Sequence, residues 1–181
     1  MLAFDVVSGA SPTLPGRHAD LARVLDALSE SLTPAPEWRQ HLDELITLEA
    51  RVPDATTGTS LLHLDVRADN LVVDGARVCF VDWPWAAKSA RWVDLVAFLP
   101  SVVMQGGSDP EPVWRAHPWS HGVDDDAVDV FLAGLAGPFT WDSLLRAPPG
   151  LPTLRAFQSG QARIARAWLA RRRGWSAAAD L

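Results

Sequence analysis

The sequence LLHLDVRADNLVVDGARVCFVDW, residues 61–83, places one histidine, four aspartates and an asparagine around two short apolar runs. The segments 70–73 and 77–82 flank Asp74-Gly75, a dipeptide typical of the turn in a β-hairpin. The stretch therefore predicts two short antiparallel strands, with polar residues gathered at their open end.

Four of these polar residues have the spacing that phosphoryl transfer needs. His63, Asp65 and Asn70 form the pattern H-x-D-x-x-x-x-N, and Asp82 ends the second strand. Kinases use one aspartate to orient the attacking hydroxyl, and an asparagine and a second aspartate to hold Mg²⁺. Taken singly, each residue also fits a structural role, such as a turn cap or a buried histidine. The four together favour Asp65 as a catalytic group, with Asn70 and Asp82 as magnesium ligands.

The composition excludes several classes of protein. The chain has 181 residues, 48% of them hydrophobic, which is typical of a globular protein. Its net charge of -6 argues against nonspecific binding to nucleic acid. Cys79 is the only cysteine, so no internal disulfide can form and a reducing, cytoplasmic location is expected. The first residues lack a cationic segment, and no apolar run reaches about 18 residues, so we expect neither a signal peptide nor a membrane span.

The rest of the chain is predicted to be mostly helical. Apolar residues at helical spacing predict helices over 19–32, 33–52, 89–103, 124–137 and 153–174. Residues 1–8 are predicted to form a short strand, and residues 104–123 a long polar and aromatic loop. The fold class is therefore α+β and mostly helical, with the β-structure gathered around the stretch 61–83.

These motifs resemble the C-terminal lobe of kinases of the aminoglycoside phosphotransferase type. The signature of that family runs approximately H-G-D-x-x-x-x-N, strand–turn–strand, [IV]-D-W and then D-L-A. The matching pieces here are His63-Leu64-Asp65, Asn70, Val81-Asp82-Trp83 and Asp94-Leu95-Val96. The chain departs from the signature at Leu64, where the family has Gly, and at Val96, where it has Ala.

The resemblance implies a role for each matching residue. Asp65 is the catalytic aspartate, Asn70 and Asp82 hold Mg²⁺, and Asp94 braces the catalytic loop. Arg67 stands where protein kinases have a lysine that touches the γ-phosphate, so it is a candidate for binding the nucleotide, with simple solvation as the alternative. The implied reaction transfers the γ-phosphate of ATP or GTP to a hydroxyl of a small molecule, such as an aminoglycoside.

The resemblance covers nearly all of the chain, as a single kinase-like C-terminal lobe over residues 1–181. Its parts are a hinge-like strand at 1–8, two helices over 19–52, the catalytic loop and metal hairpin at 61–83, and a helical substrate-side subdomain at 90–181.

The family's N-terminal lobe, which clamps the nucleotide, has no counterpart here. Only 64 residues precede Asp65, and Lys88 is the only lysine. Losing cations that are already positioned at a phosphoryl-transfer site weakens transition-state stabilisation, so we expect weak or absent activity. The alternative is a non-catalytic binding or interaction module, with a second copy or another chain covering the exposed inter-lobe face. A third interpretation is a helical domain with a small hairpin and no kinship to kinases.

Three further features are predicted to be structural. His117 and His121 are four residues apart, but Pro118 favours a loop or a helix start over a metal site. The arginines 171–173 are predicted to form a solvated helix end, because the acidic chain argues against a nucleic-acid patch. Cys79 is predicted to be a buried core residue of its strand.

The acidic residues outside the stretch 61–83 leave two alternatives open. Asp124 to Asp126 and Asp129 could face a cationic substrate, but helix capping explains the first three equally well and is favoured. Asp109 and Glu111 fall in the predicted loop 104–123, where they either line an acceptor pocket or are simply solvated, and solvation is favoured.

Overall fold

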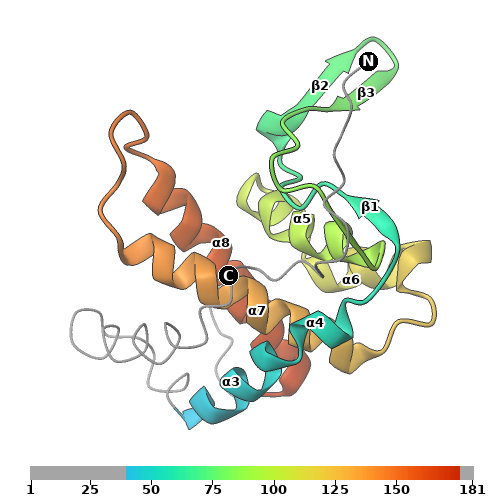
Figure 1. Ribbon diagram of the computed structural model, residues 1–181, viewed down its shortest axis with the longest axis vertical. Coiled ribbons are helices and arrows are strands. Elements are labelled where there is room, and N and C mark those ends of the chain that lie inside the picture. The colour runs from blue at the N-terminus through green and yellow to red at the C-terminus, as the bar shows by residue number, and fades with distance from the viewer. Residues whose placement is uncertain (1–39, 176–181) are drawn as a thin grey trace.

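Helix α7, Asp125–Leu144, runs through the middle of the molecule, and the other helices pack around it (Figure 1). The computed structural model of the chain describes residues 40–175, so the strand predicted at 1–8 and the helix predicted over 19–32 lie outside the described residues. The longer helices around α7 are α3, Leu42–Ala50, α5, Trp92–Met104, and α8, Leu154–Arg173. The fold is α+β and mostly helical, as predicted.

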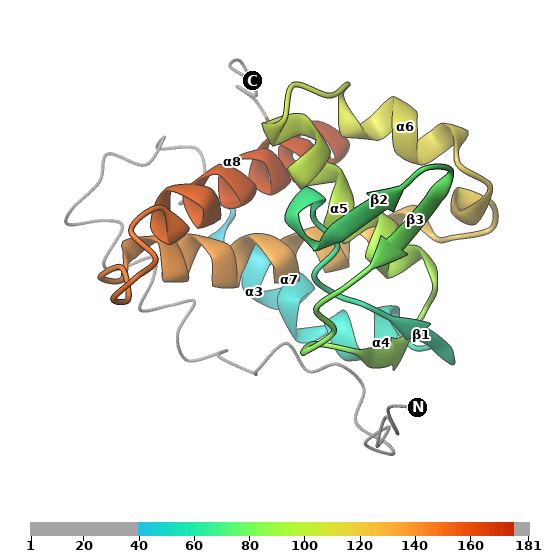
Figure 2. The same cartoon turned by 90° about the horizontal axis from the view of Figure 1, so that it is seen from above.

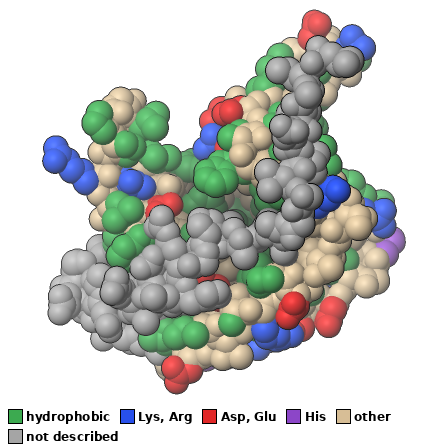
Figure 3. All heavy atoms as spheres, in the orientation of Figure 1, with side chains coloured by type: hydrophobic (Ala, Val, Ile, Leu, Met, Phe, Trp, Pro, Cys, Tyr) green, Lys and Arg blue, Asp and Glu red, His purple; other side chains and the backbone are tan. Residues whose placement is uncertain are grey.

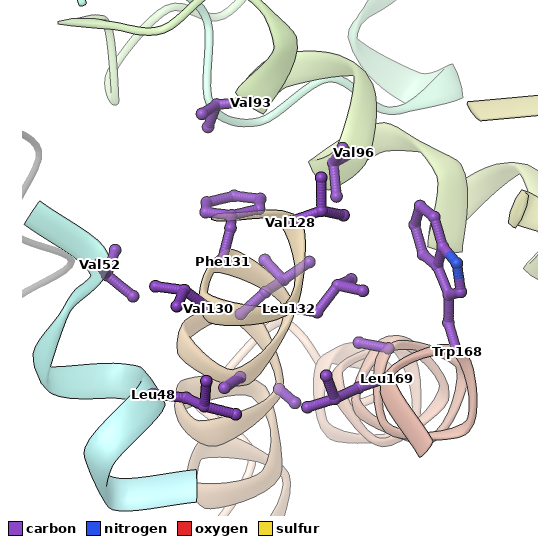
Figure 4. Close-up of a cluster of buried hydrophobic side chains, with 14 of the residues drawn as sticks. Leu48, Val52, Val93, Val96, Val128, Val130, Phe131, Leu132, Trp168 and Leu169 are labelled. Atoms are coloured by element: carbon purple, nitrogen blue, oxygen red, sulfur yellow. The ribbon is translucent and has the colours of Figure 1, made fainter. Parts of the chain in front are cut away.

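The hydrophobic core forms where α7 meets its neighbours (Figure 4). Val128 and Leu132 of α7 are fully buried, with Val96 of α5 on one side and Leu169 of α8 on another. Val52 approaches from the short helix α4, Val52–Ala55, which follows α3. Each such side chain contributes about 1.5–3 kcal/mol when it is buried. This core fixes α5, whose first turn carries Asp94.

The predicted hairpin is present, and its turn lies one residue later than expected. Strand β2, Leu71–Asp74, pairs antiparallel with β3, Arg77–Phe80, and the register sets Asp74 opposite Arg77. The turn is therefore Gly75-Ala76, and Gly75 has a φ of 58°, a conformation that glycine adopts without steric cost. A second small sheet, which the sequence did not predict, pairs β1, Ser60–Leu62, with β4, Ala87–Ser89.

The hairpin projects away from the helices, and both of its faces are exposed (Figures 1 and 2). Cys79 is exposed, so its prediction as a buried core residue is wrong. The strand has alternating apolar residues, but none of the helices within residues 40–175 covers it, and Val73 and Val78 keep 68% and 57% of their surface exposed. An apolar strand pattern indicates the conformation of a strand and does not by itself show that a second layer covers it.

The predicted loop at 104–123 is partly helical, so that prediction is wrong. It contains α6, Pro110–Ala116, and the 3₁₀-helix η2, Pro118–Ser120. Asp109 caps α6 by accepting a hydrogen bond from the amide of Glu111 at 2.9 Å, and Nδ1 of His117 accepts one from the amide of Trp119 at 3.1 Å. A proline at the first position is pre-set for a helix and gives up no needed donor. His117 therefore caps η2, as the helix-start alternative predicted.

The arginines at the end of α8 are not solvated, which contradicts the prediction for 171–173. Arg172 keeps only 5% of its side chain exposed and forms three ion pairs, with Asp129 at 2.5 Å, Glu111 at 2.8 Å and Asp125 at 3.1 Å. Burial acts to raise the pKa of Glu111, but hydrogen bonds from Trp168 and Arg172 outweigh burial and hold that pKa below its usual value. The prediction that Glu111 is solvated is therefore also wrong.

The neighbouring arginines extend the same network to other helices. Arg173 reaches Glu44 of α3 at 2.5 Å, and it lies 3.4 Å from both Asp126 and Asp129 of α7. Asp124 caps α7 by accepting from the amide of Asp126 at 3.0 Å, which confirms the capping alternative for the start of that helix. These acidic side chains are occupied by internal arginines, so the network stabilises the fold.

None of the helices in the part of the chain that the structure describes is both long enough and apolar enough to cross a membrane.

Replacing Arg172 by Gln is expected to lower the free energy of unfolding by about 3 kcal/mol, because the buried carboxylate of Asp129 loses its nearer cation and keeps only Arg173 at 3.4 Å. Arg163 lies exposed on the same helix, and Arg163→Gln should change stability by less than about 0.5 kcal/mol. Urea unfolding followed by circular dichroism measures both variants. Equal stability of the two variants would contradict the role of Arg172.

Candidate functional site

The loop of residues 63–70, here called the Asp65 loop, is held by a single carboxylate. Oδ2 of Asp94 accepts a hydrogen bond from the amide of His63, and Oδ1 accepts one from the amide of Leu64, both at 2.8 Å. The predicted bracing role of Asp94 is therefore confirmed. Leu64 has a φ of 61°, which costs a residue other than glycine about 1–2 kcal/mol. The two charge-assisted hydrogen bonds hold the loop in this conformation.

His63 fastens the Asp65 loop to the segment that follows β3. Its ring is buried, its Nε2 lies 2.9 Å from the carbonyl oxygen of Val81, and its Nδ1 accepts from the amide of Asp65 at 3.3 Å. A carbonyl can only accept, so Nε2 carries the proton. The ring of Trp83 packs against the His63 ring with centroids 4.5 Å apart. His63 is a satisfied, buried histidine with a positioning role.

Asn70 joins Asp65 to the open end of the hairpin. Its buried side-chain amide donates to the backbone carbonyl of Asp65 at 2.8 Å and to the Asp65 carboxylate at 3.1 Å. The backbone carbonyl of Asn70 accepts a hydrogen bond from the backbone amide of Val81 at 2.9 Å, which extends the strand pairing beyond Leu71 and Phe80. The structure therefore brings Asp65 and Asn70 together at the end of the hairpin where Asp82 follows Val81.

Asp82 lies exposed, directly after this last pairing, with a φ of 62°. Aspartate tolerates this left-handed conformation better than most residues. Within residues 40–175, no hydrogen bond or ion pair engages the carboxylate of Asp82 or the amide oxygen of Asn70. Both oxygens are available as ligands for a hard cation.

The oxygens of Asn70 and Asp82 fit magnesium only if a bound ligand supplies further oxygens. Within the described residues, no group of three or more His, Cys, Asp or Glu side chains is placed to hold a metal ion. Mg²⁺ in phosphoryl-transfer sites is bound by one or two protein oxygens, with phosphate oxygens and water completing the shell. Asn70 and Asp82 provide such a pair and would require a phosphorylated ligand to complete it.

Opposing effects act on the pKa of the Asp65 carboxylate. Burial raises its pKa above the usual value, while the cation of Arg67 and the hydrogen bond from Asn70 act to lower it. Nε of Arg67 lies 3.3 Å from Oδ1 of Asp65, and Nη2 of Arg67 lies 3.2 Å from Asp69. Arg67 is therefore paired with the loop's own acids, and the simple solvation considered for it is wrong.

The guanidinium of Arg67 also lies over the ring of Phe157, 5.1 Å from the ring centroid. Phe157 belongs to the first turn of α8, far along the sequence from the Asp65 loop. No spacing or motif in the sequence links the two residues. This contact is the part of the site that the sequence analysis missed.

The surface beside the hairpin is hollowed between β2–β3 and the connection from α7 to α8 (Figure 3). Large hydrophobic side chains are exposed on both of these parts, Val73, Val78 and Phe80 on the hairpin and Leu145 and Leu151 on the connection. The Asp65 loop lies at the base of the hairpin, on the hairpin side of this hollow, because Asn70 leads directly into β2.

No family model, no curated protein and no solved structure matches this chain. The assignment of the site therefore depends on the geometry of its own residues.

Replacing Asp94 by Asn is expected to destabilise the protein by about 1–3 kcal/mol, because the amide group can accept from only one of the two loop amides and turns a donor toward the other. Asp54→Asn in α4 is the matched control, since Asp54 is exposed. Amide hydrogen exchange should accelerate at His63 and Leu64 in the Asp94 variant alone. Unchanged protection at both amides would contradict the brace.

Proposed function

We propose that this chain is a kinase-like phosphotransferase lobe of the aminoglycoside phosphotransferase type, which moves the γ-phosphate of ATP or GTP to a hydroxyl of a small molecule. The observation that carries the proposal is the joint placement of three groups. The Asp94 brace fixes Asp65, and Asn70 ties Asp65 to the hairpin end that bears Asp82. Kinase chemistry requires this combination of a loop aspartate and two oxygen ligands.

The conformation of Leu64 gives independent support. The family signature has glycine at this position, and the backbone here has the positive φ that favours glycine. A glycine at this position would adopt the same positive φ without steric cost, so the loop conformation suits the signature residue although Leu64 differs from it. The hydrogen bonds from Asp94 and the packing of the Leu64 side chain against the core offset the cost of the substitution.

In the proposed reaction, Asp65 accepts a hydrogen bond from the acceptor hydroxyl and takes its proton. The hydroxyl oxygen forms the new bond to phosphorus, and the bond from phosphorus to the departing nucleoside diphosphate breaks. Burial raises the pKa of Asp65, which makes its carboxylate a better proton acceptor than an exposed one.

Asn70 and Asp82 would hold Mg²⁺, which when bound neutralises the charge on the phosphate oxygens. Arg67 adds a cation 3.3 Å from the Asp65 carboxylate, and a guanidinium there would favour binding of the same phosphate oxygens. Because Arg67 is already paired with both Asp65 and Asp69, we propose that these groups bind phosphate weakly and that transfer is slow.

Binding of Mg·ATP by the 181-residue protein is expected to require both Mg²⁺ and Asp82. Isothermal calorimetry should detect binding to the wild type, and Asp82→Asn should reduce the affinity at least about tenfold, because one metal carboxylate is lost. Asp74→Asn, at the exposed tip of the same hairpin, should bind like the wild type. Equal binding by all three proteins would remove Asp82 from the site, and no heat with the wild type would contradict the proposal.

A second candidate function is a non-catalytic interaction module that retains these residues. The observation that favours it is an exposed apolar face of the hairpin, where Val73, Val78 and Phe80 keep between 46% and 68% of their surface exposed. Clusters of exposed apolar side chains are typical of interaction sites. A second copy of the chain or another protein would cover this face.

If a second copy covers the hairpin, the protein should form a dimer that dissociates on dilution. Val73→Asp places a charge in the apolar face and should shift the protein to a monomer in sedimentation velocity. Leu151→Asp adds the same charge at an exposed site on the α7–α8 connection and should leave the dimer intact. A wild-type protein that stays monomeric at every attainable concentration would exclude the homodimer.

A further inference from the structure

The side chain of Arg67 is held by contacts that do not by themselves fix its orientation. Nε lies 3.3 Å from the carboxylate of Asp65 but is buried without a hydrogen bond, because the two groups are not aligned for one. Nη2 lies 3.2 Å from Asp69, whose side chain is 68% exposed. An ion pair to an exposed aspartate is weak, since water competes for both groups.

The third contact of Arg67 is with the face of an aromatic ring. The guanidinium carbon lies 5.1 Å from the ring centroid of Phe157, within the range of a cation–π interaction. A planar guanidinium stacks well on such a ring, and the ring then sets the plane in which its N–H donors point. Phe157 thus restricts the orientation that the two aspartates leave free.

The part of α8 that carries Phe157 is itself anchored. Nε and Nη2 of Arg155 donate to the carbonyl oxygen of Arg146, at 3.3 and 3.1 Å, and Nη1 of Arg155 donates to Gln158 at 2.7 Å. The two bonds to Arg146 tie the first turn of α8 back to the connection from α7, and the bond to Gln158 lies within α8. The ring of Phe157 is therefore presented from a fixed helix and does not depend on a free loop.

We propose that Phe157 is a positioning residue of the Asp65 loop, which holds the guanidinium of Arg67 beside the Asp65 carboxylate with its donors directed at the site. The functional part of this inference rests on the proposed phosphotransferase activity. In that reaction, Phe157 would keep a phosphate-binding cation ordered before the nucleotide arrives. It would also couple the first turn of α8, on the proposed acceptor side, to the loop that bears Asp65.

The test observes Arg67 directly, in the full-length protein without nucleotide or metal. The Nε–H group of Arg67 gives its own proton–nitrogen signal, assigned by its loss in Arg67→Gln. In the wild type, the Phe157 ring should shift this signal and slow its exchange with water. Phe157→Leu should return the shift to that of a free arginine and speed exchange about fivefold, as expected for the loss of a contact worth roughly 1 kcal/mol.

Two variants separate positioning from packing. Phe157→Tyr keeps the ring and should keep both the shift and the slow exchange. Phe139→Leu removes a partly buried ring of α7 that packs on the core, and it should leave the Arg67 signal unchanged. The inference is overturned if Phe157→Leu leaves the Arg67 signal as in the wild type, or if Phe157→Tyr or Phe139→Leu alters the signal as much as Phe157→Leu does.

This readout requires no catalysis, so its failure is distinguishable from failure of the phosphotransferase proposal. Suppose that the order of Arg67 depends on the Phe157 ring but the protein binds no Mg·ATP. Phe157 would then still position Arg67, and its proposed role in phosphoryl transfer would be wrong. If Mg·ATP does bind, Phe157→Leu should weaken that binding by the same factor as Arg67→Gln, and the double variant should be no weaker than either. Independent, additive losses would overturn the inference.

Discussion

The carboxylate of Asp94 accepts the amide hydrogens of His63 and Leu64, and the geometry of the candidate site depends on this pair of bonds. A carboxylate that receives two backbone amides fixes the direction of the chain as well as its position. It holds Leu64 in a left-handed conformation, and that bend sets the direction in which the chain continues to Asp65. Asp94 lies in the first turn of α5, and α5 packs in the core, so the loop is attached to a fixed helix.

The molecule combines a rigid helical body with a hairpin that is fixed only at its base. Two hydrogen bonds of Val81 anchor that base. The His63 ring donates to the carbonyl of Val81, and the amide of Val81 donates to the backbone carbonyl of Asn70. The body is locked by Arg172, whose buried guanidinium pairs with acids from α6 and α7. Buried charges are costly unless they are paired, so this network favours one arrangement of the helices over others. The acids that looked suited to a cationic substrate are used inside the fold.

Local signals in the sequence predicted the parts of the fold that depend on local physics. The turn glycine and flanking apolar residues identified β2 and β3, and helical spacing identified α5, α7 and α8. The brace by Asp94 followed from a motif whose residues are 31 positions apart, because the family resemblance supplied the pairing. The short helix α6 was missed, since its start signal of Asp109 followed by Pro110 was read as part of a loop.

The other errors fall where the environment of a residue is set by distant parts of the chain. The apolar pattern around Cys79 predicted a strand correctly but did not predict that Cys79 would be exposed. The charge of Arg172 predicted exposure, whereas its partners Glu111 and Asp129 lie 61 and 43 residues away. The contact of Arg67 with Phe157 has the same character. Such long-range contacts depend on how the helices pack, and no pattern in a single sequence predicts that packing.

We propose that Asn70 and Asp82 bind a metal ion together with the phosphates of a nucleotide. The most direct measurement replaces Mg²⁺ by paramagnetic Mn²⁺ and records amide spectra of the protein with Mn·ATP at substoichiometric amounts. We expect the signals of Asn70, its side-chain amide included, and of Asp82 to broaden first, and we expect Mn²⁺ without ATP to have little effect on them. Broadening centred on the acids of α6 and α7, or spread evenly over the acidic surface, would contradict the proposal.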